Sequence, residues 1–189
     1  LDYLATTFIE SGWDVKAMQK KIVMSATYRQ SSVLVKVHAA RDPENILLGR
    51  FPRYRLSAEM IRDQALHISG LLNAKIGGPS VYPYQPDKMW SSLSFQNMDE
   101  YDTNFYRPDK GDKLYRRGLY TYWKRTIAPP RMQIFDAPDR ERCSLRTDIT
   151  NTPIQAMVLL NDPTFVEASR VYAQRILHEG GESRADRVR

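Results

Sequence analysis

The stretch RTDITNTPIQAMVLLNDPTFVEASR, residues 146–170, contains one short pattern twice. The tripeptides Asn-Thr-Pro (151–153) and Asn-Asp-Pro (161–163) stand on either side of the apolar run 154–160. Proline is favoured in the first turn of a helix, where the N–H that it lacks would be unpaired, and the polar residue before it can cap free backbone N–H groups. We therefore predict a helix beginning at each proline. Because IQAMVLL is nearly all apolar, we expect the first of these helices to be short and buried in the core.

Other segments also have helical spacing of their apolar residues. Residues 1–9 and 14–26 each place apolar side chains on one face, and a short helical turn is expected at 42–44. In 57–73, Ser57 provides an N-cap and Glu59 lies in the first turn. The buried stripe expected for this helix consists of Met60, Ile61, Ala65, Ile68 and Leu72. We predict a mainly α fold, a helical domain with little β-sheet.

A different composition marks residues 76–112, where prolines and glycines interrupt a tract rich in Tyr, Trp and Phe. Loops of this length inside a compact domain are usually functional or disordered, and the density of aromatic residues argues against disorder. We expect a long irregular excursion, rich in aromatic residues and proline, that is packed by its own side chains. The following segment, 116–125, is compatible with either a strand or a helix.

Length and composition limit the protein classes. A chain of 189 residues fits one domain, which we place over residues 1–189. No run approaches the roughly 18 apolar residues that a membrane helix needs, so no membrane span is expected. Residue 1 is Leu with no leader before it, which suggests a segment of a longer protein. One cysteine and three dispersed histidines show no metal-ligand spacing, so no metal site is predicted.

Positive charge is concentrated in one region. Residues 107–146 contain eleven Lys or Arg and five Asp or Glu, a surplus equal to the net charge of +6 of the whole chain. Any anionic partner should therefore bind in this region. Aromatic residues interleaved with cations can also bind nucleic acid, but no nucleic-acid-binding motif is present, so nucleic acid is an unlikely partner.

The segment FDAPDRERCSLR, residues 135–146, has the richest set of polar side chains. Asp136 and Asp139 flank a proline, and arginines follow at once. Such residues could hold an anion through bidentate arginine contacts, or could satisfy one another in an internal salt-bridge network. The first hypothesis places a carboxylate or sulfate of a sugar chain within a group that also includes polar residues of neighbouring segments: Arg117, Arg125, Arg140, Arg146 and Asn151.

Two further hypotheses remain open from the residues alone. Asp136 or Asp139 could act as a general acid or base in a carbohydrate-active enzyme. Alternatively, the chain could be a purely structural interaction domain, which burial of the aromatic tract would favour. Spacing within a loop does not fix side-chain geometry, so the sequence does not decide whether the protein is an enzyme.

Nearly the whole chain, roughly residues 1–180, resembles a known family. The resemblance is carried, in order, by LATTFIESGWDVKAMQKKIVMSATYRQSS, RFPRYRLSAEMIRDQAL, KIGGPSVYPYQPD, YRRGLYTYWKRTIAPPRMQIFDAPDRERC and TNTPIQAMVLLNDPTFVEASR. These segments are similar to the planctomycete-specific domain PSD-one, also called domain of unknown function fifteen-fifty-three.

The resemblance implies a cellular location and a domain arrangement, but it implies no catalytic residues. It implies the C-terminal module of a large exported bacterial protein, in a periplasmic or extracytoplasmic location, with a cytochrome-c-like haem region elsewhere in the polypeptide. No haem-binding CxxCH occurs in this chain, so we expect no cofactor in this segment. The expected role is binding or scaffolding, with other domains of the same polypeptide or an acidic polysaccharide as partner.

Overall fold

The structure is a computed structural model, and it describes residues 1–86, 89–90, 106–124, 126–141, 143, 145 and 149–181, without the side chains of residues 38–39. Its contacts divide the chain into two compact units, Leu1–Arg55 and Leu56–Arg189. Each unit is described by itself. The single domain that we predict over residues 1–189 stays a prediction.

The first unit contains helices α1 (Asp2–Glu10), α2 (Val15–Val23) and α3 (Lys36–Arg41). The side chain of Asp14 caps α2 by accepting from the backbone N–H of Ala17 at 3.0 Å. Gly12 takes the left-handed conformation after α1, with a φ of 70°, as its place between the two predicted helices suggests. No side chain described in this unit is buried.

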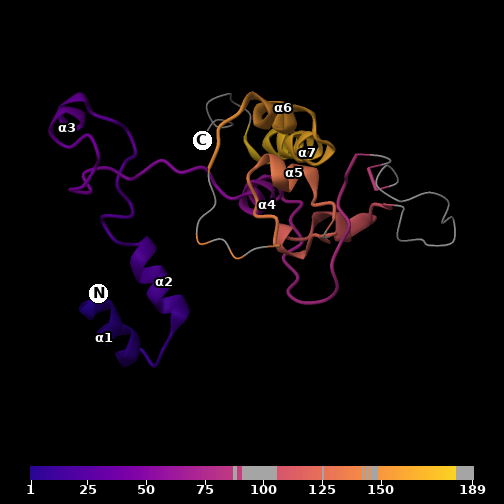
Figure 1. Ribbon diagram of the computed structural model, residues 1–189. Coiled ribbons are helices and arrows are strands. Elements are labelled where there is room, and N and C mark those ends of the chain that lie inside the picture. Colours follow the sequence, from indigo (N-terminus) through magenta and orange to yellow (C-terminus); the bar gives the residue numbers. More distant parts are fainter. Residues whose placement is uncertain are drawn as a thin grey trace. The chain divides into compact units, whose positions relative to one another are not determined.

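Four helices of the second unit gather into one group: α4 (Ala58–Ser69), α5 (Pro130–Ile134), α6 (Pro153–Asn161) and α7 (Pro163–Glu179) (Figure 1). Their core contains Ala58 of α4, Met132 of α5, Phe165 of α7 and Phe135 directly after α5. Between α4 and α5 the described residues include the short 3₁₀ helices η3 (Gly111–Tyr115) and η4 (Gly118–Tyr120). The mainly α fold with little sheet is thus confirmed.

Both repeated Pro patterns begin helices, as predicted. Thr152 is the N-cap residue of α6, and its backbone N–H donates to Oε1 of Gln155 at 3.3 Å. Asp162 ends α6 and caps α7, because its side chain accepts from the backbone N–H of Thr164 at 2.9 Å. The helices α6 and α7 therefore meet at a single residue.

The predicted burial of α6 is wrong. Ile154, Met157 and Leu160 are 58%, 62% and 75% exposed, and the one buried side chain of the helix is that of Gln155. The amide of Gln155 donates to the carbonyl oxygen of Ile134 at 2.9 Å, so a polar contact sets which face of α6 turns inward. Because the run is apolar on all sides, α6 has no polar face to turn toward solvent. It therefore keeps apolar side chains on its outer surface.

The predicted stripe of α4 is also partly wrong. Met60 and Ile68 are 59% and 41% exposed. The buried face instead consists of Ala58, Arg62, Leu66 and Ser69. Arginine is rarely buried unless its donors are satisfied, and the partners that satisfy Arg62 lie more than 50 residues along the chain.

The described part of the 76–112 excursion is irregular up to η3, as predicted. Its aromatic side chains pack together: Tyr82 stacks on Tyr122 with ring centroids 4.8 Å apart, and Trp90 meets the edge of Tyr106 at 5.1 Å. Trp90 is only 6% exposed. The described residues of 116–125 form neither a strand nor an α-helix, but η4 and isolated bridges such as that between Val81 and Thr121.

Candidate functional site

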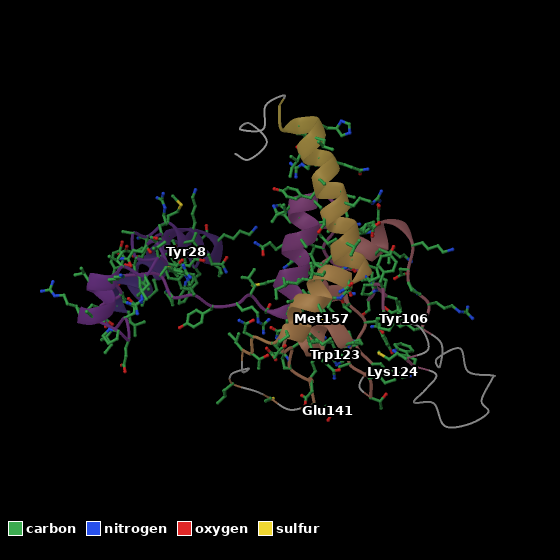
Figure 2. All side chains as sticks on the ribbon, turned by 90° about the horizontal axis from the view of Figure 1, so that it is seen from above. Tyr28, Tyr106, Trp123, Lys124, Glu141 and Met157 are labelled. Carbon is green, nitrogen blue, oxygen red and sulfur yellow. The ribbon has the colours of Figure 1, made fainter. Side chains whose placement is uncertain are left out.

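A cavity of about 560 Å³ lies among α5, α6, the start of α7 and the irregular segment 83–86. This volume is within the usual range of small-ligand sites, roughly 300 to 1,000 Å³. Its wall is mainly apolar, with Met132 and Ile134 from α5 and Ile154, Met157 and Val158 from α6. Met157, labelled in Figure 2, is 62% exposed although it lines the cavity. Five described prolines complete the wall: Pro83, Pro86, Pro129, Pro130 and Pro163.

Local sequence explains why this wall is rigid. Pro130 begins α5 and Pro163 begins α7, where the fixed φ of proline suits the first helical turn. The 83–86 strip is fixed by a hydrogen bond from the Tyr106 hydroxyl to the carbonyl oxygen of Pro83. Because proline has a fixed φ, these parts of the wall lose little conformational freedom when a ligand binds.

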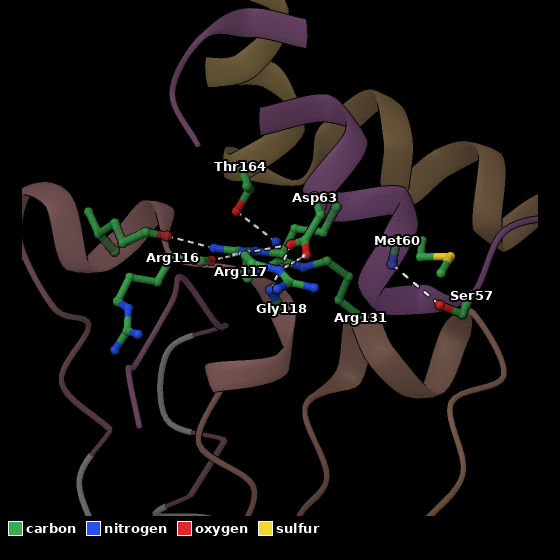
Figure 3. Close-up of polar contacts among 10 residues, drawn as sticks. Ser57, Met60, Asp63, Arg116, Arg117, Gly118, Arg131 and Thr164 are labelled. Carbon is green, nitrogen blue, oxygen red and sulfur yellow. Dashed lines mark hydrogen bonds and ion pairs between the residues drawn. The ribbon is translucent and has the colours of Figure 1, made fainter. Parts of the chain in front are cut away.

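Arg131 of α5 joins three elements at the cavity. Its Nη1 donates to Oγ1 of Thr164 at 2.7 Å, its Nη2 donates to the carbonyl oxygen of Tyr84 at 2.8 Å, and its Nε lies 3.2 Å from Oδ2 of Asp162. Figure 3 shows the contact between Arg131 and Thr164. Nε, Nη1 and Nη2 of Arg131 thus each have a partner. Arg131 connects α5 to the start of α7 and to residue 84.

Arg62 of α4 also lines the cavity. It is 1% exposed, and its terminal nitrogens donate to the carbonyl oxygens of Leu114 and Arg116, each at 2.6 Å. Burial, followed by the positive charge of Arg131, lowers the pKa of Arg62 from 12.5 to about 10. Arg62 is therefore still a cation near neutral pH, and Asp63 at 3.7 Å is its nearest carboxylate.

Three residues of the wall carry a buried polar atom without a hydrogen-bond partner among the described residues. These atoms are Nε of Arg62, Oε1 of Gln85 and Oγ1 of Thr121. A buried polar group left unpaired costs about 1 to 3 kcal/mol. Unpaired atoms also occur on Trp90, Trp123 and Arg116, which do not line the cavity. These atoms are buried behind the cavity surface, so they add no hydrogen-bonding capacity to it.

Two carboxylates, Asp63 and Asp162, pair with the arginines near the cavity. Asp162 pairs with Arg131 at 3.2 Å, and Asp63 pairs with Arg62 at 3.7 Å. Asp63 also accepts from the backbone N–H of Gly118 at 2.6 Å and lies 3.7 Å from Arg117, which is 48% exposed (Figure 3). Two carboxylates thus serve three arginines, of which Arg62 and Arg131 are buried.

The arginines predicted to bind an anion already have acidic partners where the structure describes them. Arg117 pairs with Asp63, and Arg140 lies 3.7 Å from Glu59 and over the ring of Trp123 at 4.2 Å. Arg117 and Arg140 thus pair with different acids of α4. Asn151 is exposed, and Arg125 and Arg146 lie outside the described residues.

The two predicted acids have different surroundings. Asp136 accepts from the backbone N–H of Thr150 at 2.8 Å and from its hydroxyl, and Gln155 of α6 is 3.5 Å away. Its φ of 58° is in the left-handed region, which Asp tolerates better than most residues. Asp139 is exposed and accepts from the backbone N–H of Glu141 at 3.0 Å, a local turn contact. Asp136 therefore ties the 135–137 turn to the start of α6.

Comparison with known proteins identifies one family. Residues 1–189 match the family PSD1, described as "Protein of unknown function (DUF1553)". The chain belongs to the PSD1 family. No curated protein and no solved structure matches it.

A search of the described residues of this PSD1 chain gave two further findings. In the part of the chain that the structure describes, no helix is long and apolar enough to cross a membrane. Within the same residues, no cluster of three or more His, Cys, Asp or Glu side chains is placed to hold a metal ion.

Sequence reasoning missed the residues that line the PSD1 cavity. Arg62 occupies a helical position that pattern analysis assigns to solvent, and Gln85 and Thr121 stand in segments without a motif. The sequence signal that bears on the cavity was its prolines. Pro129 and Pro130 stand at the start of α5 and Pro163 at the start of α7, and all three line the cavity. Nothing in the sequence indicates that the starts of these two helices line the same cavity.

Proposed function

We propose that this chain is a binding module, and that the cavity among α5, α6, α7 and residues 83–86 is its ligand site. One observation carries the proposal: a cavity of about 560 Å³ has a mainly apolar wall that includes five prolines. A concave and mostly apolar site of this volume is the usual form of a ligand site. A ligand there would gain burial of its apolar groups.

The contacts of the acidic residues favour binding over catalysis. A general acid or base must be free to exchange a proton with a substrate. Asp162 is held by Arg131 and by the N-terminus of α7, and Asp136 is held by Thr150. An enzyme that uses Asp136 or Asp139 stays an alternative prediction, with no observation of the site in its favour.

The packing of the aromatic residues favours a protein partner. Polysaccharide sites present exposed aromatic platforms, whereas Tyr82, Trp90, Tyr106 and Tyr122 pack on one another. The exposed apolar side chains of α6 next to the cavity suit contact with another polypeptide. We therefore propose scaffolding within a larger protein, with a segment of another domain of the same polypeptide as the first candidate ligand.

An acidic polysaccharide is the second candidate. Arg117 and Arg140 are 48% and 41% exposed, so each could also contact an outside anion. The haem-containing neighbouring region, with haem c held outside this segment, and the periplasmic or extracytoplasmic location remain proposals that rest on the family resemblance described above.

The experiment uses N-phenyl-1-naphthylamine, an uncharged probe whose fluorescence rises in apolar sites. Met157 and Leu177 are both 62% exposed, but only Met157 lines the cavity. We expect wild type and Leu177→Gln to bind the probe equally, and Met157→Gln to bind it several-fold more weakly, since a polar group replaces part of the wall. Equal binding by all three chains, or no binding by wild type, would contradict the proposal.

A further inference from the structure

We infer that the loop formed by residues 42–50 of the first unit binds the surface of an anionic lipid bilayer, and that its tip enters the outer edge of the hydrocarbon layer. The inference concerns a surface other than the cavity and goes beyond the proposed function. Three properties of the loop carry it: the exposure of its tip, the hydrogen bonds of its backbone, and the positive charge of the residues around it.

The tip of the loop presents three successive apolar side chains. Ile46, Leu47 and Leu48 are 74%, 81% and 54% exposed. Because each of the three is more than half exposed, the apolar surface continues around the tip and is not confined to one face. Single apolar residues are normal on a protein surface, whereas a contiguous apolar group usually marks an interaction site.

Hydrogen bonds hold the loop in this shape. Nδ2 of Asn45 donates to the carbonyl oxygen of Arg50 at 2.7 Å, and the backbone N–H of Arg50 donates to Oδ1 of Asn45 at 3.1 Å. The guanidinium of Arg50 also donates to the carbonyl oxygens of Asp42 and Pro43, at 3.0 Å and 2.6 Å. The tip is therefore ordered before it binds, and little conformational entropy is lost on binding.

The backbone N–H groups of the tip are paired within the loop. Those of Ile46 and Leu47 donate to the two carboxylate oxygens of Asp42, at 2.9 Å and 2.8 Å, and that of Leu48 donates to the carbonyl oxygen of Asn45 at 3.2 Å. Lipid offers no hydrogen-bond partner, so only a backbone that is already paired enters hydrocarbon at low cost. The same pairing disfavours a protein partner that adds a strand, because strand addition needs open N–H groups.

The charges around the tip complement an anionic surface. Residues 36–55 contain five cations and two acids, a surplus of three: Lys36, Arg41, Arg50, Arg53 and Arg55 against Asp42 and Glu44. Lys36, Arg41 and Arg53 are exposed, and the carboxylate of Asp42 is engaged by the tip. Apolar groups in the interface with cations beside them are the usual chemistry of binding to an anionic membrane surface. Three apolar residues are far too few to span a bilayer, so the loop would lie at the interface.

The test is cosedimentation of the whole 189-residue chain with vesicles of phosphatidylcholine and phosphatidylglycerol in equal parts, compared with vesicles of phosphatidylcholine alone. We expect binding to the anionic vesicles that falls as the salt concentration rises, and much weaker binding to the neutral vesicles. Leu47→Gln should weaken binding about tenfold, because a polar amide then has to enter lipid. The matched control is Leu160→Gln on α6, where Leu160 is 75% exposed, and it should bind as wild type does.

The contribution of charge is tested by a second pair of variants. Arg41→Gln should weaken binding to the anionic vesicles about fivefold at low salt. Arg170→Gln removes an exposed cation of α7 and should have a much smaller effect. Both pairs replace exposed side chains, so thermal unfolding without vesicles should be nearly the same for all four variants and wild type.

A fluorescent label shows which surface enters the lipid. Cys143 is the single cysteine of the chain, so Cys143→Ser allows Leu47→Cys or Leu160→Cys to be labelled alone. The label is a nitrobenzoxadiazole group, whose emission rises in apolar surroundings. We expect a several-fold rise with anionic vesicles for the label at residue 47 and no rise for the label at residue 160.

The contrary results are equally specific. Absence of binding to the anionic vesicles would overturn the inference and would favour a protein groove as the surface that the loop fits. Equal binding to both kinds of vesicle, equal losses in Leu47→Gln and Leu160→Gln, or an equal rise of the two labels would also overturn it. None of these results bears on the cavity, because binding of N-phenyl-1-naphthylamine is measured without vesicles.

Discussion

Arg62 of α4 donates a hydrogen bond of 2.6 Å to the carbonyl oxygen of Arg116, which lies 54 residues further along the chain. A second bond of 2.6 Å reaches the carbonyl oxygen of Leu114. One guanidinium thus satisfies two backbone acceptors, one within η3 and one directly after it. Arg116 continues the pattern, because its own guanidinium donates to the carbonyl oxygens of Lys75, Gly77 and Pro79.

Replacement of Arg62 should therefore destabilise the second unit strongly. Arg62→Met keeps much of the side-chain volume but leaves two buried carbonyl groups without donors, and we expect a loss of about 2 to 5 kcal/mol in the free energy of unfolding. Urea denaturation measures this loss. Arg170→Met is the matched control, since Arg170 is exposed on α7, and it should change stability by less than about 0.5 kcal/mol. Similar losses in both variants would show that Arg62 does not hold the 114–116 segment.

Gly118 is required for a close approach to α4. A Cβ at this position would lie 3.1 Å from the Cα of Glu59, tighter than ordinary packing. The backbone N–H of Gly118 also donates to Asp63 at 2.6 Å, so the segment cannot move away without losing this bond. We expect Gly118→Ala to destabilise the chain by about 1 to 3 kcal/mol in chemical denaturation. No loss of stability would mean that η4 can shift relative to α4.

The two predicted acids should differ in their effect on stability. Asp136→Ala removes the acceptor of Thr150 and places Ala in a left-handed conformation, and we expect a loss of about 1 to 3 kcal/mol. Asp139→Ala removes one exposed turn contact and should cost less than about 1 kcal/mol. Thermal unfolding of both variants checks the order. Equal stability of the two, together with loss of a glycan-cleaving activity, would instead support the enzyme hypothesis.

Tyr115 should make stability fall at alkaline pH. Its hydroxyl donates to Oε1 of Glu167 at 2.9 Å, and burial, followed by this bond, raises the pKa of Tyr115 from 10.0 to about 12. The fold therefore favours the neutral phenol. This contribution is complete below the unfolded pKa of 10.0 and is lost as pH rises toward 12.

Urea denaturation of wild type and Tyr115→Phe between about pH 8 and pH 11 tests this sign. The stability difference between the two proteins should be constant at the lower end and should shrink as pH rises. Other alkaline titrations, including that of Arg62, occur in both proteins and cancel in the difference. A difference independent of pH would contradict the assigned interaction.

Local signals made much of the fold predictable. Asp14, Ser57 and Asp162 are polar residues directly before apolar periodic segments, and each of them caps a helix. The starts of α6 and α7 followed from Pro153 and Pro163 alone. Caps and first-turn prolines act within one helical turn, so the sequence contains everything needed to place them.

The site was not predictable in the same way, because it depends on contacts between distant segments. The apolar run of α6 indicated a helix but not what covers it, and Met157 is in fact 62% exposed. Arg62 looked like a surface residue, since its acceptors lie more than 50 residues away. The cluster of cations after residue 107 suggested an anion site, yet Arg116 and Arg131 within it are buried and donate to backbone and side-chain acceptors.

The most direct test of the binding site is a methyl NMR spectrum of the chain with ¹³C-labelled methionine, recorded with and without saturating N-phenyl-1-naphthylamine. Met132 and Met157 line the cavity, and Met132 is only 2% exposed, so a ligand on the outer surface could not reach it. Met18, Met24 and Met60 lie elsewhere and serve as internal references. The account predicts shifts of Met132 and Met157 with the three reference signals unchanged. An unshifted Met132 signal at saturation would show that the probe binds outside the cavity and would contradict the central claim.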